Sequence, residues 1–399
     1  MKKLIIIALL VIMSFSFCFA PVAMAEPVAS AAYDYMSEFV TKYEKRGSDT
    51  NCTEYLVEKL QGFGLEPFYS DKYTDDFDFR YSSVTYFSKN VAAIKKGTSS
   101  ENLVIIGAGY DNVSGWTNSI TAQGAYSNGS GIGVLIALAE KLSSETFDYD
   151  IVFVCYGAEQ MGCYGSETFL RRLSNAQTTS IILYIDLDSI GAGDNLYMYC
   201  DESERIHETY FKNASSKVGA KLTDIPNDKK LIAVQSGITG LPYTHAMLDG
   251  ALAYYYAKGI NCLGFKSFNW DLEFIGYYKE SASHQNIAST NNDNLNTLEL
   301  YYGDEVKVKM NDVVNIVYEG LSGENFVQTM KESASNVPKQ DYTVWKILYA
   351  VLIGIIVVML IIFFILGSKA GPTGGGNNTV KQDETVKDKE ENVFDEFGI

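Results

Sequence analysis

The sequence predicts an α/β fold with a mostly parallel central sheet, helices on both faces of that sheet, and one C-terminal transmembrane helix. Two observations indicate the sheet. Short apolar segments alternate along the chain with segments of helical periodicity, and polar motifs directly follow the apolar segments. A third observation, the long uncharged segment at residues 347–366, indicates the membrane helix.

Each predicted strand is a short apolar segment with the length of a buried strand. The predicted strands are residues 90–94, 103–107, 151–156, 181–187 and 196–199. The predicted helices are residues 33–43, 53–63, 132–142 and 167–173. Because the two kinds of segment alternate, crossover connections and parallel strands are expected. In such folds the site lies at the carboxyl ends of the strands.

The composition restricts the classes of function. The chain has 399 residues, with 32 Lys and Arg against 49 Asp and Glu and a formal net charge of −17. A protein that binds nucleic acid by neutralising its phosphates is therefore not expected. Hydrophobic residues make up 47% of the chain, which excludes a wholly disordered protein and allows a sizeable core.

The N-terminus has the pattern of a secretory signal peptide. Lys2 and Lys3 precede an apolar stretch, and Ala23-Met24-Ala25 forms a small-x-small cleavage site. Residues 1–25 are therefore predicted to be removed. The alternative is an uncleaved anchor, because the apolar stretch alone does not decide processing.

Residues 347–366 carry no charge and are long enough, as a helix, to cross about 30 Å of hydrocarbon. Trp345 and Lys346 precede this segment, and Lys369 follows it. A buried core helix is the alternative, although cores rarely supply an apolar run of this length. Behind a signal peptide, such a segment predicts a single-pass protein of the cell membrane with its main domain outside the cytoplasm. The short basic start of the signal peptide and the absence of dense disulfides suit a bacterial cell envelope, and the lineage stays open.

The predicted organisation therefore has five parts. They are a signal peptide (1–25), an ectodomain (26–332), a juxtamembrane linker (333–346), the transmembrane helix (347–366) and a disordered cytoplasmic tail (367–399). The last residues of the tail, Phe394 to Ile399, include large apolar side chains after a polar segment. They are a candidate docking segment for a cytoplasmic partner, and the alternative is an unconstrained chain end.

The cysteines and histidines form no recognisable metal-binding spacing. The predicted ectodomain contains Cys52, Cys155, Cys163, Cys200 and Cys262, with no CxxC pair, so their disulfide pairing stays open. Cys155 and Cys262 lie in apolar runs and are expected to be buried. Of the three histidines, His207 is expected on a solvated helix face, and His245 has no ligand partner at metal spacing.

Four motifs stand at predicted strand ends or helix starts. They read GAGYD at residues 107–111, GAYSNGSG at 124–131, GAEQMGCYGS at 157–166 and DLDS at 186–189, and a late histidine, His284, follows them. In this order and spacing, and with KRGS at residues 45–48, the chain resembles the co-catalytic di-zinc aminopeptidases, metallopeptidase family twenty-eight. The resemblance covers about residues 30 to 320.

The resemblance implies a two-zinc peptidase site with five ligand positions, three of which are substituted here. Gly109 stands where the family has a histidine, Ser127 where an aspartate bridges both metals, and Gln160 where a glutamate binds one metal. Asp188 and His284 stand at retained ligand positions. After His284, a serine and a threonine replace the Asp-Thr pair that usually follows, and for this histidine a purely structural role is favoured.

Two further acids match the family's pattern. Glu159 stands at the position of the general base, and Asp111 at that of an aspartate that supports the ligands without touching the metal. A catalytic zinc needs about three protein donors, and a neutral glutamine oxygen is a poor one. The substitutions therefore predict that the metal centre is lost, that there is no cofactor, and that Glu159 has no activated water to deprotonate.

These expectations favour a domain that binds a protein or peptide outside the cell, as a scaffold or receptor. Paired tyrosines, which are common at interfaces, agree with binding. The main alternative is an active zinc exopeptidase tethered to the membrane, with Asp111, Glu159, Asp188 and His284 rearranged around one metal. A glutaminyl-cyclase-like transferase with a single zinc is a third possibility, and it relies on the same missing acids.

Overall fold

The computed structural model describes residues 28–48, 51–200, 205–224, 250–274, 277–335 and 343–368. The predicted signal peptide, His245 and residues 394–399 lie outside the described residues. The chain divides into two compact units, residues 1–337 and 338–399. The second unit contains helix α12 (Thr343–Ser368), and the rest of this subsection concerns the first unit.

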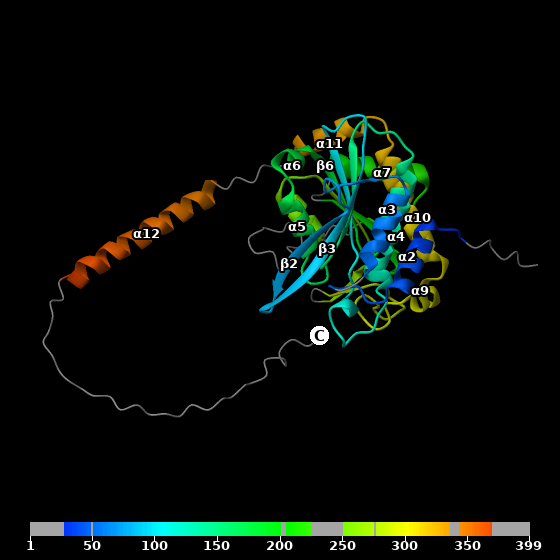
Figure 1. The fold of residues 1–399 in the computed structure, drawn as a ribbon, viewed down its shortest axis with the longest axis horizontal. Helices are drawn as coiled ribbons and strands as arrows, with labels where there is room; N and C mark the ends of the chain where they lie inside the picture. The colour runs from blue at the N-terminus through cyan, green and yellow to red at the C-terminus, as the bar shows by residue number, and fades with distance from the viewer. Residues whose placement is uncertain are drawn as a thin grey trace, which may run out of the picture. The chain divides into compact units, whose positions relative to one another are not determined.

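The described part of the first unit contains a nine-stranded sheet (Figure 1). Its strands are β1 (Glu66–Pro67), β2 (Thr74–Tyr81), β3 (Val84–Lys95), β4 (Leu103–Gly109), β5 (Asp150–Tyr156), β6 (Ile181–Leu187), β7 (Asn195–Cys200), β8 (Cys262–Phe274) and β9 (Tyr277–Lys279). The main order is β1-β3-β5-β4-β6-β8-β7, with β2 paired to β3 and β9 paired to β8. The predicted strands correspond to β3 through β7.

The sheet is mixed, so the prediction of a mostly parallel sheet is wrong. Only the central strands β5, β4, β6 and β8 pair in parallel among the described residues. β2 and β3 are joined by Ser82 and Ser83, both with positive φ, which gives a tight antiparallel hairpin. β6 and β7 are separated by a short loop without a helix, and β7 pairs antiparallel with β8. The tight turn between β2 and β3 permits only antiparallel pairing, because parallel pairing needs a long crossover. β7 and β8 pair antiparallel although α7 and α8 lie between them in the chain.

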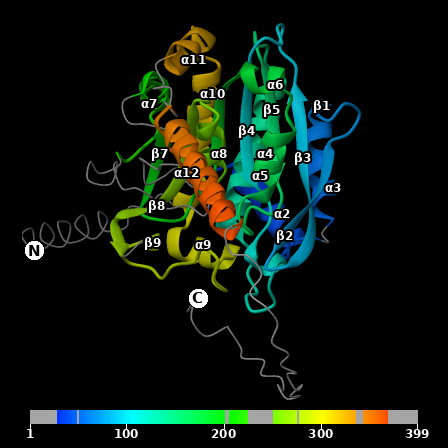
Figure 2. The same ribbon diagram turned by 90° about the vertical axis from the view of Figure 1, so that its left-hand side faces the viewer.

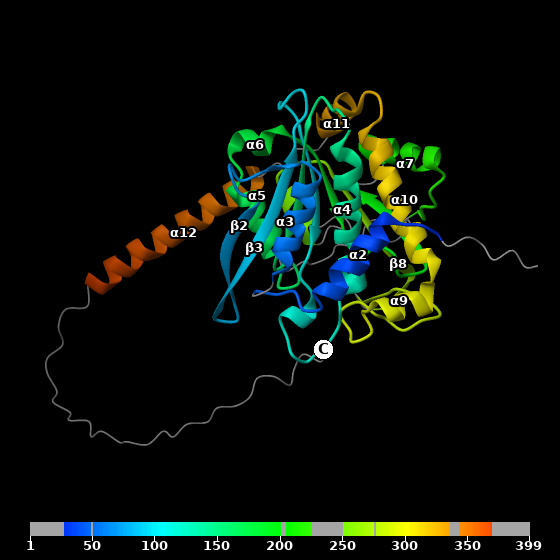
Figure 3. The same cartoon turned by 45° about the vertical axis from the view of Figure 1, so that its right-hand side comes forward.

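Helices cover both faces of the sheet, as the sequence predicts. One face packs on α2 (Ala31–Lys42), α3 (Cys52–Gly62), α4 (Ser130–Ser143), α7 (Ile206–Val218), α10 (Asp304–Leu321) and α11 (Phe326–Ser335). The other packs on α5 (Tyr164–Arg172) and α8 (Gly250–Ala257). Figures 2 and 3 show α5 and α6 (Asn175–Ser180) on the side of the sheet opposite α2 and α3.

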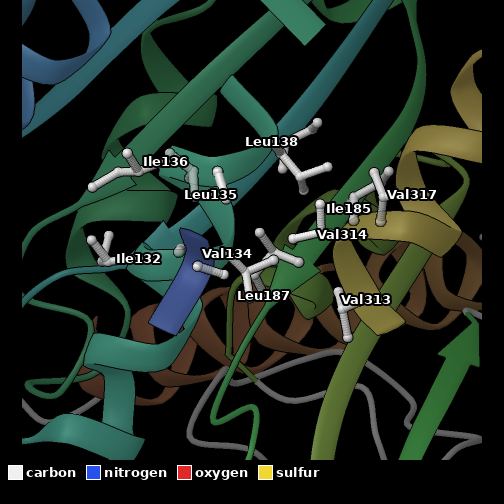
Figure 4. Close-up of a cluster of buried hydrophobic side chains, with 14 of the residues drawn as sticks. Ile132, Val134, Leu135, Ile136, Leu138, Ile185, Leu187, Val313, Val314 and Val317 are labelled. Carbon is white, nitrogen blue, oxygen red and sulfur yellow. The ribbon is translucent and has the colours of Figure 1, made fainter. Parts of the chain in front are cut away.

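The larger core lies between the sheet, α4 and α10. On β4, Val104 and Ile106 face this core while Ile105 faces the other layer, as the two-residue period of a strand requires. In Figure 4, apolar side chains of α4 lie beside Ile185 and Leu187 of β6 and beside the valines of α10. This packing fixes the strands whose carboxyl ends carry the motifs.

Other predictions have different outcomes. Cys155 and Cys262 are buried, as predicted. His207 is fully buried in α7, so its predicted place on a solvated face is wrong: its ring bonds Ser333 Oγ at 2.7 Å and the Cys262 carbonyl at 3.0 Å. The residues next to His207 in α7 are polar, which suggested a solvated face, but α11 and β8 cover the face of α7 that carries His207. Judged on the described residues, no helix is long and apolar enough to span a membrane.

Candidate functional site

A cleft of about 320 Å³ lies at the carboxyl ends of the central parallel strands. Its lining residues are Gly109, Asn128, Glu159, Gln160, Gly162, Cys163, Asp186, Leu187, Asp188, Gly250 and Ala251. Four of the residues singled out by sequence, Gly109, Glu159, Gln160 and Asp188, therefore share one cleft. His284 is not among these lining residues.

Asp111 lies behind the cleft and holds the loop that follows β5. Its carboxylate accepts hydrogen bonds from the backbone N–H of Glu159 at 2.9 Å, from that of Gln160 at 3.1 Å, and from Trp116 Nε1 at 2.7 Å. Burial raises the pKa of the Asp111 carboxyl to about 6, against the opposing effect of these hydrogen bonds. Asp111 therefore positions the loop that carries both family glutamate positions.

Glu159, at the general-base position, is bound to the start of α5. Its Oε1 accepts from the Ser166 backbone N–H at 2.8 Å, and its Oε2 accepts from the Ser166 hydroxyl at 3.0 Å. Burial raises the pKa of the Glu159 carboxyl to about 8, although the Ser166 hydrogen bonds act against the rise. Both carboxyl oxygens are thus bound to the first turn of a helix, where backbone N–H groups lack helical partners.

The three substituted ligand positions offer no strong metal donor. A β-carbon at Gly109 would come within 3.0 Å of the Glu159 side chain, so a histidine there requires that side chain to shift. Ser127 donates its backbone N–H to Asp293 at 3.1 Å. Its hydroxyl lies 3.5 Å from Gln160 Nε2, which orients the amide nitrogen toward it. Hydroxyl and amide groups are weak zinc ligands beside carboxylates.

Asp188, a retained ligand position, is paired with a lysine. Lys266 Nζ lies 2.6 Å from Asp188 Oδ2, and the Ser189 hydroxyl donates to Asp188 Oδ1 at 2.8 Å. Burial acts to raise the pKa of the Asp188 carboxyl, but the Lys266 ammonium and the two hydrogen bonds together hold it below its usual value. Asp188 is therefore an ionised carboxylate whose charge is balanced within the chain.

His284 lies against α9 (Leu295–Tyr302). Its ring stacks on Tyr301, with centroids 4.5 Å apart and planes at 9°, and meets Tyr302 edge-on at 5.4 Å. The loop that carries it is held by Glu280, whose carboxylate accepts from the Ile287 and Ala288 N–H groups at 2.8 and 3.1 Å. These contacts support a structural role for His284.

Sequence reasoning missed three residues that organise the site: Lys266, Ser166 and Asp293. Asp293 is fully buried and accepts from the Tyr126 N–H at 2.7 Å and from the Ser127 N–H at 3.1 Å. Its own signal was weak, because a lone Asp among asparagines is typical of a turn. Lys266 can be placed beside Asp188 only from the register between β6 and β8. That register is known only once the structure shows that the two strands are neighbours.

Arg46, in the KRGS segment, ties together the loops around the cleft. It is fully buried and donates to the Tyr110, Tyr43, Gln123 and Gly124 carbonyl oxygens at 2.6–3.0 Å. Its guanidinium also lies over the Phe39 ring at 5.0 Å. Arg46 thus connects the end of β4 to the segment that contains Ser127.

The donor set does not fit a two-zinc centre. Among the residues that the structure describes, no group of three or more His, Cys, Asp or Glu side chains is placed to hold a metal ion. The two retained carboxylates in the cleft, Glu159 and Asp188, are each bound by groups of this chain. A catalytic zinc needs about three donors and one open position.

Part of the chain matches a known protein family, and several known proteins are similar to it. Residues 90–246 match the model of Peptidase family M28. The alkaline phosphatase isozyme conversion protein of Escherichia coli K12 is 28% identical over 178 residues, which cover 41% of this chain and 46% of that protein. Aminopeptidase YwaD of Bacillus subtilis 168 is 32% identical over 106 residues, covering 26% and 22%. The matches thus span less than half the length of these relatives.

A solved structure shows the same fold at low sequence identity. A glutaminyl cyclase from an Acidobacteriales bacterium superposes with a TM-score of 0.52 at 15% identity. The match covers 76% of this chain and 99% of that one. The mixed α/β architecture is therefore that of this solved structure, and the residues matched by the family model include all four motifs.

Proposed function

We propose that this chain, which carries a zinc-aminopeptidase-like domain of Peptidase family M28, binds a peptide or protein ligand without hydrolysing it. In this proposal the domain lies outside the cytoplasm and is joined by one membrane helix at residues 347–366 to a cytoplasmic tail. The cleft at the strand ends serves as the ligand site, and no metal ion takes part.

One observation carries the proposal: the two family carboxylates in the cleft are bound by neighbouring groups of the same chain. Glu159 accepts two hydrogen bonds from Ser166, and Asp188 is paired with Lys266 at 2.6 Å. The groups at the three substituted positions, Gly109, Ser127 and Gln160, add no anionic donor. Among the described residues that line the cleft, these carboxylates therefore do not form the set of free anionic donors that a zinc site uses.

The loss of the metal would remove the hydrolytic step. Bulk water has a pKa of about 15.7, and a bound zinc lowers it to about 7. A carboxylate alone does not generate enough hydroxide at neutral pH to attack a peptide bond. Glu159 would then stabilise the start of α5 and shape the cleft wall.

The cleft retains features suited to a peptide. Its wall offers the amide side chain of Gln160. A β-carbon added at Gly162 or Gly250 would come no closer than 3.6 Å to any described atom outside its chain neighbours, which leaves room for a backbone to approach. Polar groups around a glycine-rich floor suit the N–H and C=O groups of a chain end. This part of the proposal rests on the lining of the cleft.

The competing function is a tethered zinc exopeptidase. The names of the sequence relatives favour it, since several are aminopeptidases, and Glu159 and Asp188 do share one cleft. This function would need the ligands to rearrange around a metal, with Lys266 released from Asp188.

Metal content separates the two functions. The full-length chain, purified in detergent, is dialysed against zinc and then against buffer, and its zinc is measured by plasma mass spectrometry. Variants Asp188→Ala and His284→Ala serve as controls. We expect less than about a tenth of an equivalent of zinc, unchanged in both variants, because competent sites need several donors. Hydrolysis of aminoacyl anilides is expected to stay at the background rate.

One or two equivalents of zinc that disappear in Asp188→Ala, together with zinc-dependent anilide hydrolysis, would contradict the proposal. That result would favour a zinc exopeptidase instead.

A further inference from the structure

The register of the sheet places one residue from each of three strands in a row at the cleft. β4 pairs Gly107 with Asp186 of β6, and β6 pairs Leu187 with Phe265 of β8. Continued along each strand, this register sets Asp188 beside Gly109 on one side and beside Lys266 on the other. Residues in register on neighbouring parallel strands face the same way, with strands about 4.8 Å apart. The backbone itself therefore brings Lys266 to Asp188.

The contact between the two side chains is close and has a second partner. Lys266 Nζ lies 2.6 Å from Asp188 Oδ2, while the Ser189 hydroxyl binds the other carboxylate oxygen at 2.8 Å. The two side chains are 23% and 32% exposed, so the pair is partly screened from water. Both oxygens of Asp188 are thus engaged within the protein.

The backbone around Lys266 is held firmly. The next residue, Ser267, is fully buried: its carbonyl accepts from the Tyr126 hydroxyl, and its own hydroxyl accepts from the Gly191 N–H at 3.0 Å. The preceding residue, Phe265, accepts from the Asp188 N–H at 3.2 Å. Tyr126 is the neighbour of Ser127, which stands at a substituted ligand position. The hydrogen bond from Tyr126 to Ser267 therefore links β8, the strand that carries Lys266, to that position as well as to Asp188.

We propose that Lys266 is the resident cation of the cleft, whose ammonium balances Asp188 and makes a divalent metal ion unnecessary there. This inference rests on the proposed loss of the metal centre, and it names the residue that compensates for that loss. An ammonium at this distance also repels a divalent ion from the same carboxylate.

An ordinary surface ion pair is the alternative explanation. Lys217 and Glu319 form such a pair, 3.2 Å apart, with the lysine 66% exposed and the glutamate 32% exposed. Exposed pairs of this kind contribute little to stability. The pair of Lys266 and Asp188 differs because it joins two neighbouring strands at the cleft, and because its aspartate is at a metal-ligand position of the family.

The test compares thermal unfolding of the full-length chain with that of Lys266→Met, in buffer with a chelator and in buffer with excess zinc. Without zinc, Lys266→Met is expected to unfold about 2–4 °C below the wild type, because Asp188 is left without a counter-ion. Zinc is expected to raise the unfolding temperature of Lys266→Met and to leave that of the wild type unchanged.

Three variants serve as controls. Lys266→Arg keeps the charge and is expected to behave as the wild type. Lys217→Met removes an exposed pair and is expected to change nothing. In the double variant Lys266→Met with Asp188→Asn, zinc is expected to have no effect, because the carboxylate is gone. Circular dichroism confirms that each variant is folded.

The inference is overturned if Lys266→Met unfolds at the wild-type temperature, or if zinc stabilises it no more than it stabilises the wild type. Should this happen while the wild type neither retains zinc nor hydrolyses anilides, the proposed binding function stands and only the role of Lys266 fails. Zinc-dependent hydrolysis by the wild type would contradict the proposed function itself.

Discussion

Four carboxyl groups around the cleft are in surroundings that favour different protonation states. Burial raises the pKa of Asp111 to about 6, that of Asp293 to about 7 and that of Glu159 to about 8. The pKa of Asp188 lies below its usual value, since Lys266 and the hydrogen bonds outweigh the effect of burial. Near neutral pH, Asp188 and most of Asp111 are thus anionic, Asp293 is close to its midpoint, and Glu159 is largely protonated.

Asp293 gives a pH prediction with a defined sign. Its pKa is about 7 in the folded chain and about 3.9 in the unfolded chain, so the folded state binds the proton more tightly. Its contribution to stability is fully present below about pH 4 and is lost as the pH rises toward about 7. The loss is on the order of 2–4 kcal/mol.

The measurement is the urea midpoint of the wild type and of Asp293→Asn at about pH 5 and about pH 8. The asparagine costs a hydrogen bond at every pH, because its NH₂ group cannot accept from the backbone N–H of Tyr126 or Ser127. The change between the two pH values is therefore the quantity to compare. A wild-type change no larger than that of Asp293→Asn would show that Asp293 does not titrate as stated.

At the scale of elements, the site depends on loops that are joined by buried polar side chains. Arg46 donates to four carbonyl oxygens. One lies just after α2, one just after β4, and two in the loop that precedes η3 (Ala125–Gly129). Burial lowers the pKa of the Arg46 guanidinium to about 10, so it stays charged at neutral pH. One residue from the N-terminal helical region thus orders two loops that are distant in sequence.

Arg46→Lys is expected to lower the free energy of unfolding by at least about 2 kcal/mol, because an ammonium cannot reproduce the fork of donors and leaves buried carbonyl oxygens without partners. Urea unfolding followed by circular dichroism measures the loss. Arg171→Lys, on an exposed position of α5, is the matched control and is expected to change stability by less than about 0.5 kcal/mol. Equal effects of the two substitutions would contradict the role of Arg46.

Strand direction also belongs to this scale. The sequence predicts the positions of β3 through β7 because a buried strand is an unbroken apolar segment. It does not predict β8, since this strand includes Lys266, Asn269 and Asp271 among its apolar residues. The pairing partner of β8, and with it the place of Lys266, is decided by contacts between residues far apart in the chain.

At the scale of the whole molecule, the membrane anchor at residues 347–366 remains a prediction. We expect the chain to stay in the membrane fraction after carbonate extraction and to be released by detergent, because residues 347–366 carry no charge and the sequence alone predicts a membrane helix there. The mature N-terminus is expected at Glu26. A variant that lacks residues 347–366 is expected to appear in the soluble extracytoplasmic fraction, and release of the intact chain by carbonate would contradict the anchor.

The sequence by itself predicted strands β3 through β7, helices α2 through α5 and the motifs that stand at strand ends. Through the family resemblance, it also predicted that Gly109, Ser127 and Gln160 replace metal ligands. These features are local: apolar periodicity and motif spacing involve residues close together in the chain. The carboxyl ends of parallel strands meet at one edge, so a common cleft for Gly109, Glu159 and Asp188 also followed.

The tertiary structure alone decided the direction of the outer strands, the burial of His207 and the pairing of Asp188 with Lys266. Each depends on contacts between distant segments: His207 is covered by α11 and β8, and Lys266 lies 78 residues beyond Asp188. The burial that raises the pKa of Asp293 has the same origin. Residue types specify which groups are able to pair, and packing decides which of them meet, because burial and register are properties of the assembled layers.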